Sequence, residues 1–358
     1  NMGTYWDDVG VIGREFYRFS SSDPRFTSDL LGKGTAVLDN NTFYITNPFS
    51  ARYRVVKNTN ILLSGLTGTT ASITAAQKTV GKAYANTIQA HELLMVLNLT
   101  NNNGIRVDVS NPDALGPFLT KAQSLDAIQN LLNTAYTGLA ANPSVSFPFN
   151  STLFGNTAGS FAQFNRALAA RVAVYKSDWN AALTALSNSF LNLGGGLSTG
   201  AYYKFSTAGG DQLTPLFFPQ NSSGETRVAH PLFISQAEAG DNRLAKVPAR
   251  TSPTTQDGLT SGFDFFVYPT NTTSIPIIRN AELILIYAEA KAQIGGAVNL
   301  LDAVNAINVI RNVAGVGNYT GLVTQSPVIT EMLKQRRYEL YGEGHRWIDM
   351  RRYNLLAT

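Results

Sequence analysis

The chain has 358 residues, of which 44% are hydrophobic and 15% charged, and it contains no cysteine. It can therefore form no disulfide, no zinc site with thiolate ligands and no cysteine nucleophile. The formal net charge of +4 is too small for the concentrated basic surface that nucleic-acid binding requires. The length allows one or two domains with a large hydrophobic core.

Hydrophobic residues spaced three or four apart predict helices along much of the first 195 residues. The predicted helices cover 77–97, 124–139, 160–175 and 179–190, and each has its apolar residues on one face. Ser177-Asp178 is typical of a turn and helix cap between the last two helices. Since so short a turn joins them, we expect these two helices to pack against one another.

A change of composition marks residues from about 197 to 275. Pro, Gly, Ser, Thr and Asn are frequent there, and aromatic clusters occur at Tyr202-Tyr203, Phe217-Phe218 and Phe263 to Tyr268. Flexible linkers lack such aromatic residues, so we predict a long irregular region that carries short strands. Helical spacing returns in 281–294, 300–310 and 327–341, and helix pairs of this size resemble tetratricopeptide-like hairpins.

Three segments near the C-terminus resemble the SusD/RagB family of Bacteroidetes. They are RNAELILIYAEA at 279–290, AINVIRNVAG at 306–315 and QRRYELYGEGHRWIDMRR at 335–352. Weaker similarity is found at 171–191 and at Asp241-Asn242-Arg243. The resemblance therefore extends over most of the chain but is strong only at its C-terminal end.

The resemblance implies a mainly α-helical fold, in which tetratricopeptide-like helix pairs form a scaffold that carries an irregular, loop-rich region with short strands. On this basis we expect one domain over residues 1–358. The helical scaffold would lie mainly in 50–195 and 276–358, and the variable region in about 197–275. We also expect that the N-terminal signal and lipid-anchor segment of the family is absent from this chain.

The family further implies a cell-surface protein that is lipid-anchored on the extracellular face of the outer membrane. Such a protein binds oligosaccharides or polysaccharides and assists nutrient uptake through a SusC-like TonB-dependent transporter. The alternative is a protein–protein scaffold or transporter lid without significant glycan affinity of its own. No enzymatic activity, cofactor, metal or nucleic-acid partner is expected, and membrane contact would be through the lipid anchor only.

Charged residues in the three C-terminal segments are expected to have structural roles. Arg346 and Asp349 are three residues apart and near enough to pair on a helix. Glu282 and Glu289 lie seven apart on one helix face. A pair of carboxylates could serve a glycosidase, but the resemblance places both in a scaffold helix. Trp347 is expected in the core.

The candidates for glycan binding are aromatic residues in segments that we expect to be irregular and polar. A flat aromatic ring covers the apolar face of a sugar, while amide, carboxylate and guanidinium groups bind its hydroxyls. The candidates are Tyr5, Trp6, Phe49, Tyr202, Tyr203 and Tyr268, with Asp7, Asp8, Asn47, Arg52 and Asp211 as polar partners. Trp6-Asp7-Asp8 is the strongest of them, because in the family an acidic element near this point often borders the glycan site.

Overall fold

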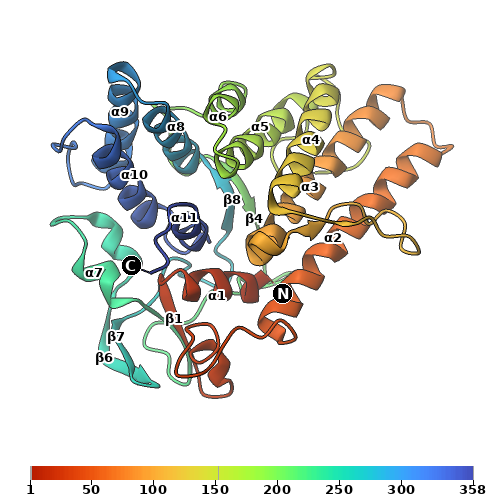
Figure 1. Cartoon of the computed structure of the whole chain (residues 1–358). Coiled ribbons are helices and arrows are strands. Elements are labelled where there is room, and N and C mark those ends of the chain that lie inside the picture. Colours follow the sequence, from red (N-terminus) through yellow and green to blue (C-terminus); the bar gives the residue numbers. More distant parts are fainter. Residues whose placement is uncertain (1, 152, 358) are drawn as a thin grey trace. The chain divides into compact units, whose positions relative to one another are not determined.

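The computed structural model describes residues 2–151 and 153–357, and the chain divides into two compact units (Figure 1). The helix-pair unit comprises residues 49–201 and 278–299, and the mixed unit comprises those up to 48, 202–277 and those from 300 onward. The predicted mainly α-helical fold with short strands is confirmed. The division groups the last 59 residues with the loop-rich region rather than with the helices before it, and the single domain stays a prediction.

Consecutive helices that pack against each other build the helix-pair unit. They are α3 Ala75–Thr100, α4 Lys121–Ala140, α5 Ala158–Tyr175, α6 Trp179–Leu186 and α8 Asn280–Ile294, together with most of α2 Phe43–Gly68. Each helix from α3 to α6 contacts the next, and α8 contacts both α5 and α6; Figure 1 shows this succession. A two-stranded antiparallel sheet, β2 Ile105–Arg106 with β3 Phe118–Leu119, lies between α3 and α4 in the sequence.

The boundaries of these helices follow from local side-chain chemistry. Thr120 and Gln123 form a reciprocal capping box at the start of α4. Asp178 accepts a hydrogen bond from the backbone N–H of Ala181 and begins α6 at the predicted turn. The prediction of a helix over 179–190 is too long, because polar turns replace helical hydrogen bonding after Leu186.

A buried ion pair joins α5 to α8. Arg171 Nε and Nη2 donate to the two carboxylate oxygens of Glu282, each at 2.6 Å. The two side chains are 4% and 1% exposed, so the pair is shielded from water. Glu289 is also buried in α8. The structural role predicted for Glu282 is thereby confirmed, and burial inside the scaffold holds both carboxylates away from a surface where a substrate could approach.

Glu282→Ala is expected to lower the free energy of unfolding by about 3–5 kcal/mol, because Arg171 would remain buried without this carboxylate. Urea denaturation measures the change. The double variant Arg171→Met with Glu282→Leu removes both charges and should cost clearly less than the single variant. An equal loss in both variants would contradict the expectation.

The mixed unit combines short strands with short and medium helices. Its elements are α1 Met2–Ile12, β1 Phe16–Ser20, β5 Glu225–Ala229, α7 Pro231–Ser235, β6 Ala249–Gln256, β7 Leu259–Phe263, α10 Gln325–Glu339 and α11 Arg346–Arg352, with most of α9 Ala297–Val313. The 3₁₀ helices are Pro24–Phe26 and Asn242–Lys246 in this unit and Asn101–Asn103 in the other. The chain passes between the units within β4 Gly200–Tyr203 and within β8 Ile275–Arg279.

Two antiparallel strand pairs organise the loop-rich region. β1 pairs with β5, with Phe16 opposite Ala229. β6 and β7 form a hairpin closed by Asp257-Gly258, whose φ angles of 52° and 80° suit the two-residue turn that matches the twist of a hairpin. The predicted irregular region with short strands is therefore confirmed, although the sequence analysis missed helix α7.

The C-terminal segment folds back on itself around Asp349. Arg336 of α10 donates to its carboxylate at 2.8 and 3.3 Å, and Arg352 donates at 3.0 Å. Burial acts to raise the pKa of Asp349, but the two guanidinium groups hold it below its usual value. The closest ion pairs of Asp349 are thus with Arg336 and Arg352 rather than with Arg346, although burial lowers the pKa of Arg346 and the charge of Asp349 acts to raise it.

Side-chain packing also explains the aromatic and glycine residues of this segment. Trp347 is 4% exposed, and the guanidinium carbon of Arg351 lies 3.3 Å from its ring centroid, so its predicted core position is confirmed. Gly342 has a φ of 77°, and a Cβ there would lie 2.7 Å from the Phe265 ring. Any larger residue at 342 would be strained both in its backbone and by this contact.

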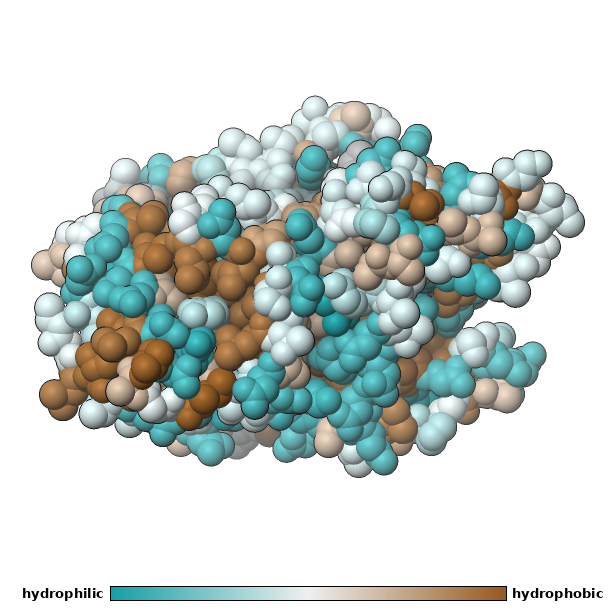
Figure 2. All heavy atoms as spheres, turned by 90° about the horizontal axis from the view of Figure 1, so that it is seen from above, coloured by the Kyte–Doolittle hydropathy of each residue, from teal (hydrophilic) through white to brown (hydrophobic). Residues whose placement is uncertain are grey.

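Several apolar side chains of helix α9 and of the loop after it are exposed. Val298 is 73% exposed, Leu301 54% and Val313 58%, and Leu322 in the loop after the helix is 73% exposed. Figure 2 shows apolar residues gathered on the left of the face seen from above. Contiguous exposed apolar residues are typical of surfaces that contact other molecules, whereas single ones are common on any protein.

Glu15 is a buried carboxyl group in the mixed unit. Its Oε1 accepts a hydrogen bond from the backbone N–H of Gly342 at 3.0 Å, and its Oε2 has no hydrogen-bond partner among residues 2–151 and 153–357. Burial raises the pKa of Glu15 from 4.5 to about 8, although the Gly342 N–H acts to lower it. At neutral pH this side chain is therefore mostly protonated.

The pKa of Glu15 predicts how stability depends on pH. Between about pH 4.5 and 8 the folded chain retains a proton that the unfolded chain releases, so stability should fall by about 1.4 kcal/mol per pH unit as the pH rises. Glu15→Gln should make this slope shallower. The slope should not vanish, because burial and the neighbouring Asp7 also raise the pKa of Asp8.

Urea denaturation of the wild type and of Glu15→Gln at pH 5, 6, 7 and 8 measures both slopes. The largest difference between the two proteins should appear at pH 8, with the variant the more stable. Parallel slopes would show that Glu15 does not retain its proton in the folded chain.

Candidate functional site

Nine of the eleven residues predicted to bind glycan lie in helices or strands, and six of the eleven are buried. Tyr5, Trp6, Asp7 and Asp8 belong to α1 and Arg52 to α2. The exposed fractions are 3% for Tyr5, 4% for Trp6, 4% for Asp7, 0% for Asp8, 5% for Arg52 and 3% for Tyr268. The expectation that Tyr5 and Trp6 lie in an irregular polar segment is wrong, because α1 is a core helix buried along most of its length.

Intramolecular ion pairs engage two of the predicted polar partners. Arg227 donates to the Asp7 carboxylate at 2.6 and 2.9 Å, and Arg52 Nη1 donates to both carboxylate oxygens of Glu92 at 3.1 Å. These pairs leave the charged groups of Asp7 and Arg52 directed at the protein itself. A direct role of either side chain in glycan binding stays a prediction.

The structure brings together three of the predicted aromatic residues. The Trp6 ring packs edge-to-face against Tyr5 and Tyr203, with centroids 6.0 and 5.8 Å apart. The Tyr268 hydroxyl donates to the backbone oxygen of Gly342 at 3.1 Å. The Trp6 contacts are those of a packed core, where each ring covers another ring.

The remaining candidates are more accessible. Tyr202, Asn47 and Phe49 are partly exposed, and Asp211 is exposed. Phe49 packs against Tyr53 with ring centroids 4.8 Å apart. Their contribution to binding also stays a prediction.

Trp6→Ala is expected to lower the free energy of unfolding by about 3–5 kcal/mol, because it removes a buried aromatic side chain and leaves a cavity. Urea denaturation followed by far-ultraviolet circular dichroism measures the change, because this signal comes from the backbone and does not depend on Trp6. Val37→Ala, at a site that is 74% exposed, should change stability by less than about 0.5 kcal/mol. If Trp6→Ala were as mild as this control, the ring would not be a core residue.

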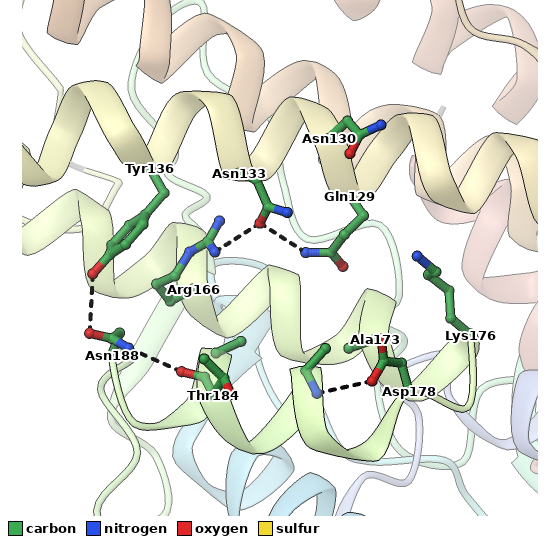
Figure 3. A pocket seen from close by; sticks show the side chains of 12 residues that line it. Gln129, Asn130, Asn133, Tyr136, Arg166, Ala173, Lys176, Asp178, Thr184 and Asn188 are labelled. Carbon is green, nitrogen blue, oxygen red and sulfur yellow. Dashed lines mark hydrogen bonds between the residues drawn. The ribbon is translucent and has the colours of Figure 1, made fainter.

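A polar hollow lies in the helix-pair unit among α4, α5 and α6 (Figure 3). It has a volume of about 490 Å³, which is within the usual range for small-molecule sites. Helix α4 contributes amide side chains and a tyrosine. Helices α5 and α6 and the residues next to their ends contribute two cations, one carboxylate, small residues and further polar groups. The lining residues are Gln129, Asn130, Asn133, Tyr136, Arg166, Ala173, Lys176, Asp178, Ala181, Thr184, Ala185 and Asn188.

Helical spacing directs the α4 side chains into the hollow. Gln129, Asn133 and Tyr136 stand at i, i+4 and i+7 and therefore share one face of the helix. Leu125, Ile128 and Leu132 are buried on the adjoining face of the same helix. The core residues thus fix the rotation of α4, and that rotation presents the polar residues to the hollow.

Hydrogen bonds order the polar lining, as Figure 3 shows. Asn133 Oδ1 accepts from Arg166 Nη1 at 3.0 Å and from Gln129 Nε2 at 3.2 Å. The Tyr136 hydroxyl donates to Asn188 Oδ1 at 3.1 Å. The guanidinium carbon of Arg166 lies 4.3 Å from the centroid of the Tyr136 ring. These contacts hold the side chains in place before any ligand binds.

The chemistry of this lining suits a polyhydroxylated ligand. Amide and phenol groups both donate and accept hydrogen bonds, as sugar hydroxyls do. Ala173, Ala181 and Ala185 add small apolar surfaces against which the face of a sugar ring can lie. Asp178 is the one carboxylate among the described lining residues, whereas glycoside hydrolysis ordinarily uses two.

A second hollow lies in the mixed unit, beside the turn of the β6–β7 hairpin. Its volume is about 520 Å³, and hydroxyl-bearing residues such as Ser20, Thr226 and Thr254 line it. The Gln256 amide there is engaged with the backbone of Ser20, to which it donates at 3.0 Å and from which it accepts at 2.8 Å. Among the described residues, no group of three or more His, Cys, Asp or Glu is placed to hold a metal ion.

The chain is similar to known proteins both in sequence and in structure. The model of the SusD family matches residues 267–358, which confirms the resemblance of the C-terminal segments. Surface glycan-binding protein A from Bacteroides thetaiotaomicron is 16% identical with a TM-score of 0.72, over 99% of this chain and 84% of that one. Its namesake from Bacteroides uniformis is 16% identical with a TM-score of 0.71, over 97% and 81% of the two chains.

The chain has the SusD fold. A structure described as a laminarin binding SusD-like protein is 17% identical with a TM-score of 0.66 and covers 99% of this chain and 90% of its own. No curated protein matches the sequence. Within the part of the chain that the structure describes, no helix has the length and apolar character needed to cross a membrane.

None of the residues predicted to bind glycan lines the hollow of the SusD-like helix-pair unit. The sequence contains one signal that could have indicated it, which is the polar face formed by Gln129, Asn133 and Tyr136 on a helix whose apolar face was recognised. Arg166, Thr184 and Asn188 line the hollow only because of the way α4, α5 and α6 pack against one another. The periodicity of a single helix does not predict that packing.

Proposed function

We propose that the protein binds glycans at the cell surface and assists their uptake through a SusC-like TonB-dependent transporter. The observation that carries this proposal is the SusD fold, shared over nearly the whole chain with proteins that are named for surface glycan binding. The family match at residues 267–358 supports it independently of the fold. In this function the chain binds its ligand without cleaving it.

The proposed location is the extracellular face of the outer membrane, with attachment through a lipid anchor, as the family resemblance implies. Contact with a transporter requires a surface for another protein. The exposed apolar residues of α9 and the following loop, Leu301, Val313 and Leu322 among them, are suited to such a contact.

The hollow among α4, α5 and α6 is the proposed glycan site. A sugar that enters it exchanges hydrogen bonds to water for hydrogen bonds to Asn133, Tyr136 and Asn188, and each exchange gains little net free energy. We therefore expect modest affinity for a single sugar and tighter binding for an oligosaccharide that fills more of the hollow. The preformed hydrogen bonds of the lining reduce the entropy lost on binding.

Isothermal titration calorimetry against a panel of neutral and acidic oligosaccharides tests the proposal. At least one glycan should bind, and Tyr136→Ala and Asn188→Ala should each weaken it by about fivefold or more, because each loses a hydrogen bond to the ligand or to its partner. Both positions border solvent, so the melting temperature should change little.

Tyr202→Ala is the matched comparison, since it removes a partly exposed tyrosine predicted from the sequence but outside this hollow. Weakened binding in Tyr202→Ala together with normal binding in Tyr136→Ala would assign the site to the mixed unit. If no glycan of the panel binds the wild type, the proposed function is wrong.

A further inference from the structure

Arg166 places a positive charge beside the hollow without a carboxylate to balance it. Arg166 is 7% exposed. Nε and Nη2 both donate to Asn165 Oδ1, at 2.8 and 2.7 Å, and Nη2 also donates to the backbone oxygen of Leu132 at 2.7 Å. Nη1 donates to Asn133 Oδ1 at 3.0 Å. Every one of these acceptors is neutral.

The other charges of the hollow are compensated locally. Lys176 Nζ lies 2.7 Å from Asp126 Oδ1, so these two form an ion pair at the rim. Asp178 accepts the backbone N–H of Ala181 at the start of α6, where the helix end stabilises negative charge. Arg166 is thus the lining cation that, within 2–151 and 153–357, makes no ion pair.

A guanidinium group so well buried is costly unless an anion lies nearby. Burial lowers the pKa of Arg166 from 12.5 to about 10, so the group is still charged at neutral pH. Arginine has five N–H donors, and the four hydrogen bonds above leave one N–H on Nη1 without an acceptor among the described residues. Its neutral partners orient the group and leave its charge available.

We propose that the ligand of the hollow is an acidic glycan, with the carboxylate of a uronic acid or a sulfate ester placed against Arg166. This inference rests on the proposed function and adds the chemical class of the sugar. A neutral glycan would leave the charge of Arg166 unbalanced, whereas an anionic substituent gains a charge-assisted hydrogen bond. Tyr136 and Asn133 line the same hollow and would bind the hydroxyls beside the acidic group.

Arg166 also links α5 to α4 through Leu132 and Asn133, so its removal tests structure as well as binding. Asn133→Asp separates the two roles. The substitution keeps the size and the acceptor oxygen of residue 133, and it places a carboxylate at the atom that already accepts from Arg166 Nη1. The protein should remain folded, while the charge of Arg166 is balanced from within.

The test compares each acidic oligosaccharide with its neutral counterpart by titration calorimetry. The ligands are oligogalacturonate and its methyl ester, and an oligosaccharide of sulfated galactan and its desulfated form. The wild type should bind at least one acidic form about tenfold or more tightly than its counterpart, as expected for a hydrogen bond to a charged group. The arm that shows the preference identifies carboxylate or sulfate, and added salt should reduce it.

Asn133→Asp should abolish most of this preference, measured within the variant as the ratio of its affinities for the acidic and neutral forms, so that a loss common to both forms cancels. Asn130→Asp adds the same charge to the same hollow, at a residue with no hydrogen bond to Arg166 among those the structure gives, and should retain most of the preference. Arg166→Gln should also lose it, and its melting temperature shows whether the variant is folded.

Three results would overturn the inference. Equal binding of acidic and neutral forms by the wild type would leave the proposed function standing and refute the acidic ligand. A preference unchanged in Asn133→Asp would place the acidic group away from Arg166. If neither acidic nor neutral forms bind, the assignment of glycan binding to this chain fails as well.

Discussion

Buried pairing of arginine with carboxylate is the interaction on which this structure depends. Arg171 pairs with Glu282, Arg336 with Asp349 and Arg227 with Asp7, and in each pair both side chains are nearly inaccessible to water. Two of these pairs join segments more than 100 residues apart. Since a buried charge without a partner is far more costly than a pair, each arginine accepts few alternatives and so specifies which segments meet.

Against this background the environment of Arg166 has a different physical meaning. For Arg171, Arg336 and Arg227 the fold supplies carboxylates, yet for Arg166 it supplies amide and carbonyl oxygens, which orient a guanidinium group without neutralising it. Tyr136 covers one face of the group at 4.3 Å, and the hollow lies beside it. A guanidinium group that is held in place and has no carboxylate partner needs little rearrangement when an anion binds. Such preorganisation is what a binding site requires.

Much of the scaffold could be predicted because its helices are long, rich in apolar residues and several of them begin at clear caps. The helix from 75 to 100 and the cap at Asp178 depend on residues within a few positions of each other. Helix α1 was missed for the opposite reason. The segment from Met2 to Ile12 is short and carries acidic residues in its middle. Asp7 and Asp8 suggested a polar loop, but Asp7 pairs with a distant arginine, Arg227.

The same distinction explains why the candidate site was not found from the sequence. Aromatic residues were sought because flat rings bind sugars, yet in Trp6 and Tyr5 the rings cover each other. The hollow is lined instead by residues whose separate signals are weak: three amides and a tyrosine on α4, an arginine in the middle of α5 and an asparagine after α6. What these residues share is that their side chains point into the same hollow. This arrangement arises only when the three helices pack with fixed rotations about their axes. Composition reveals the chemistry that a chain can offer, whereas packing decides which groups remain available to a ligand.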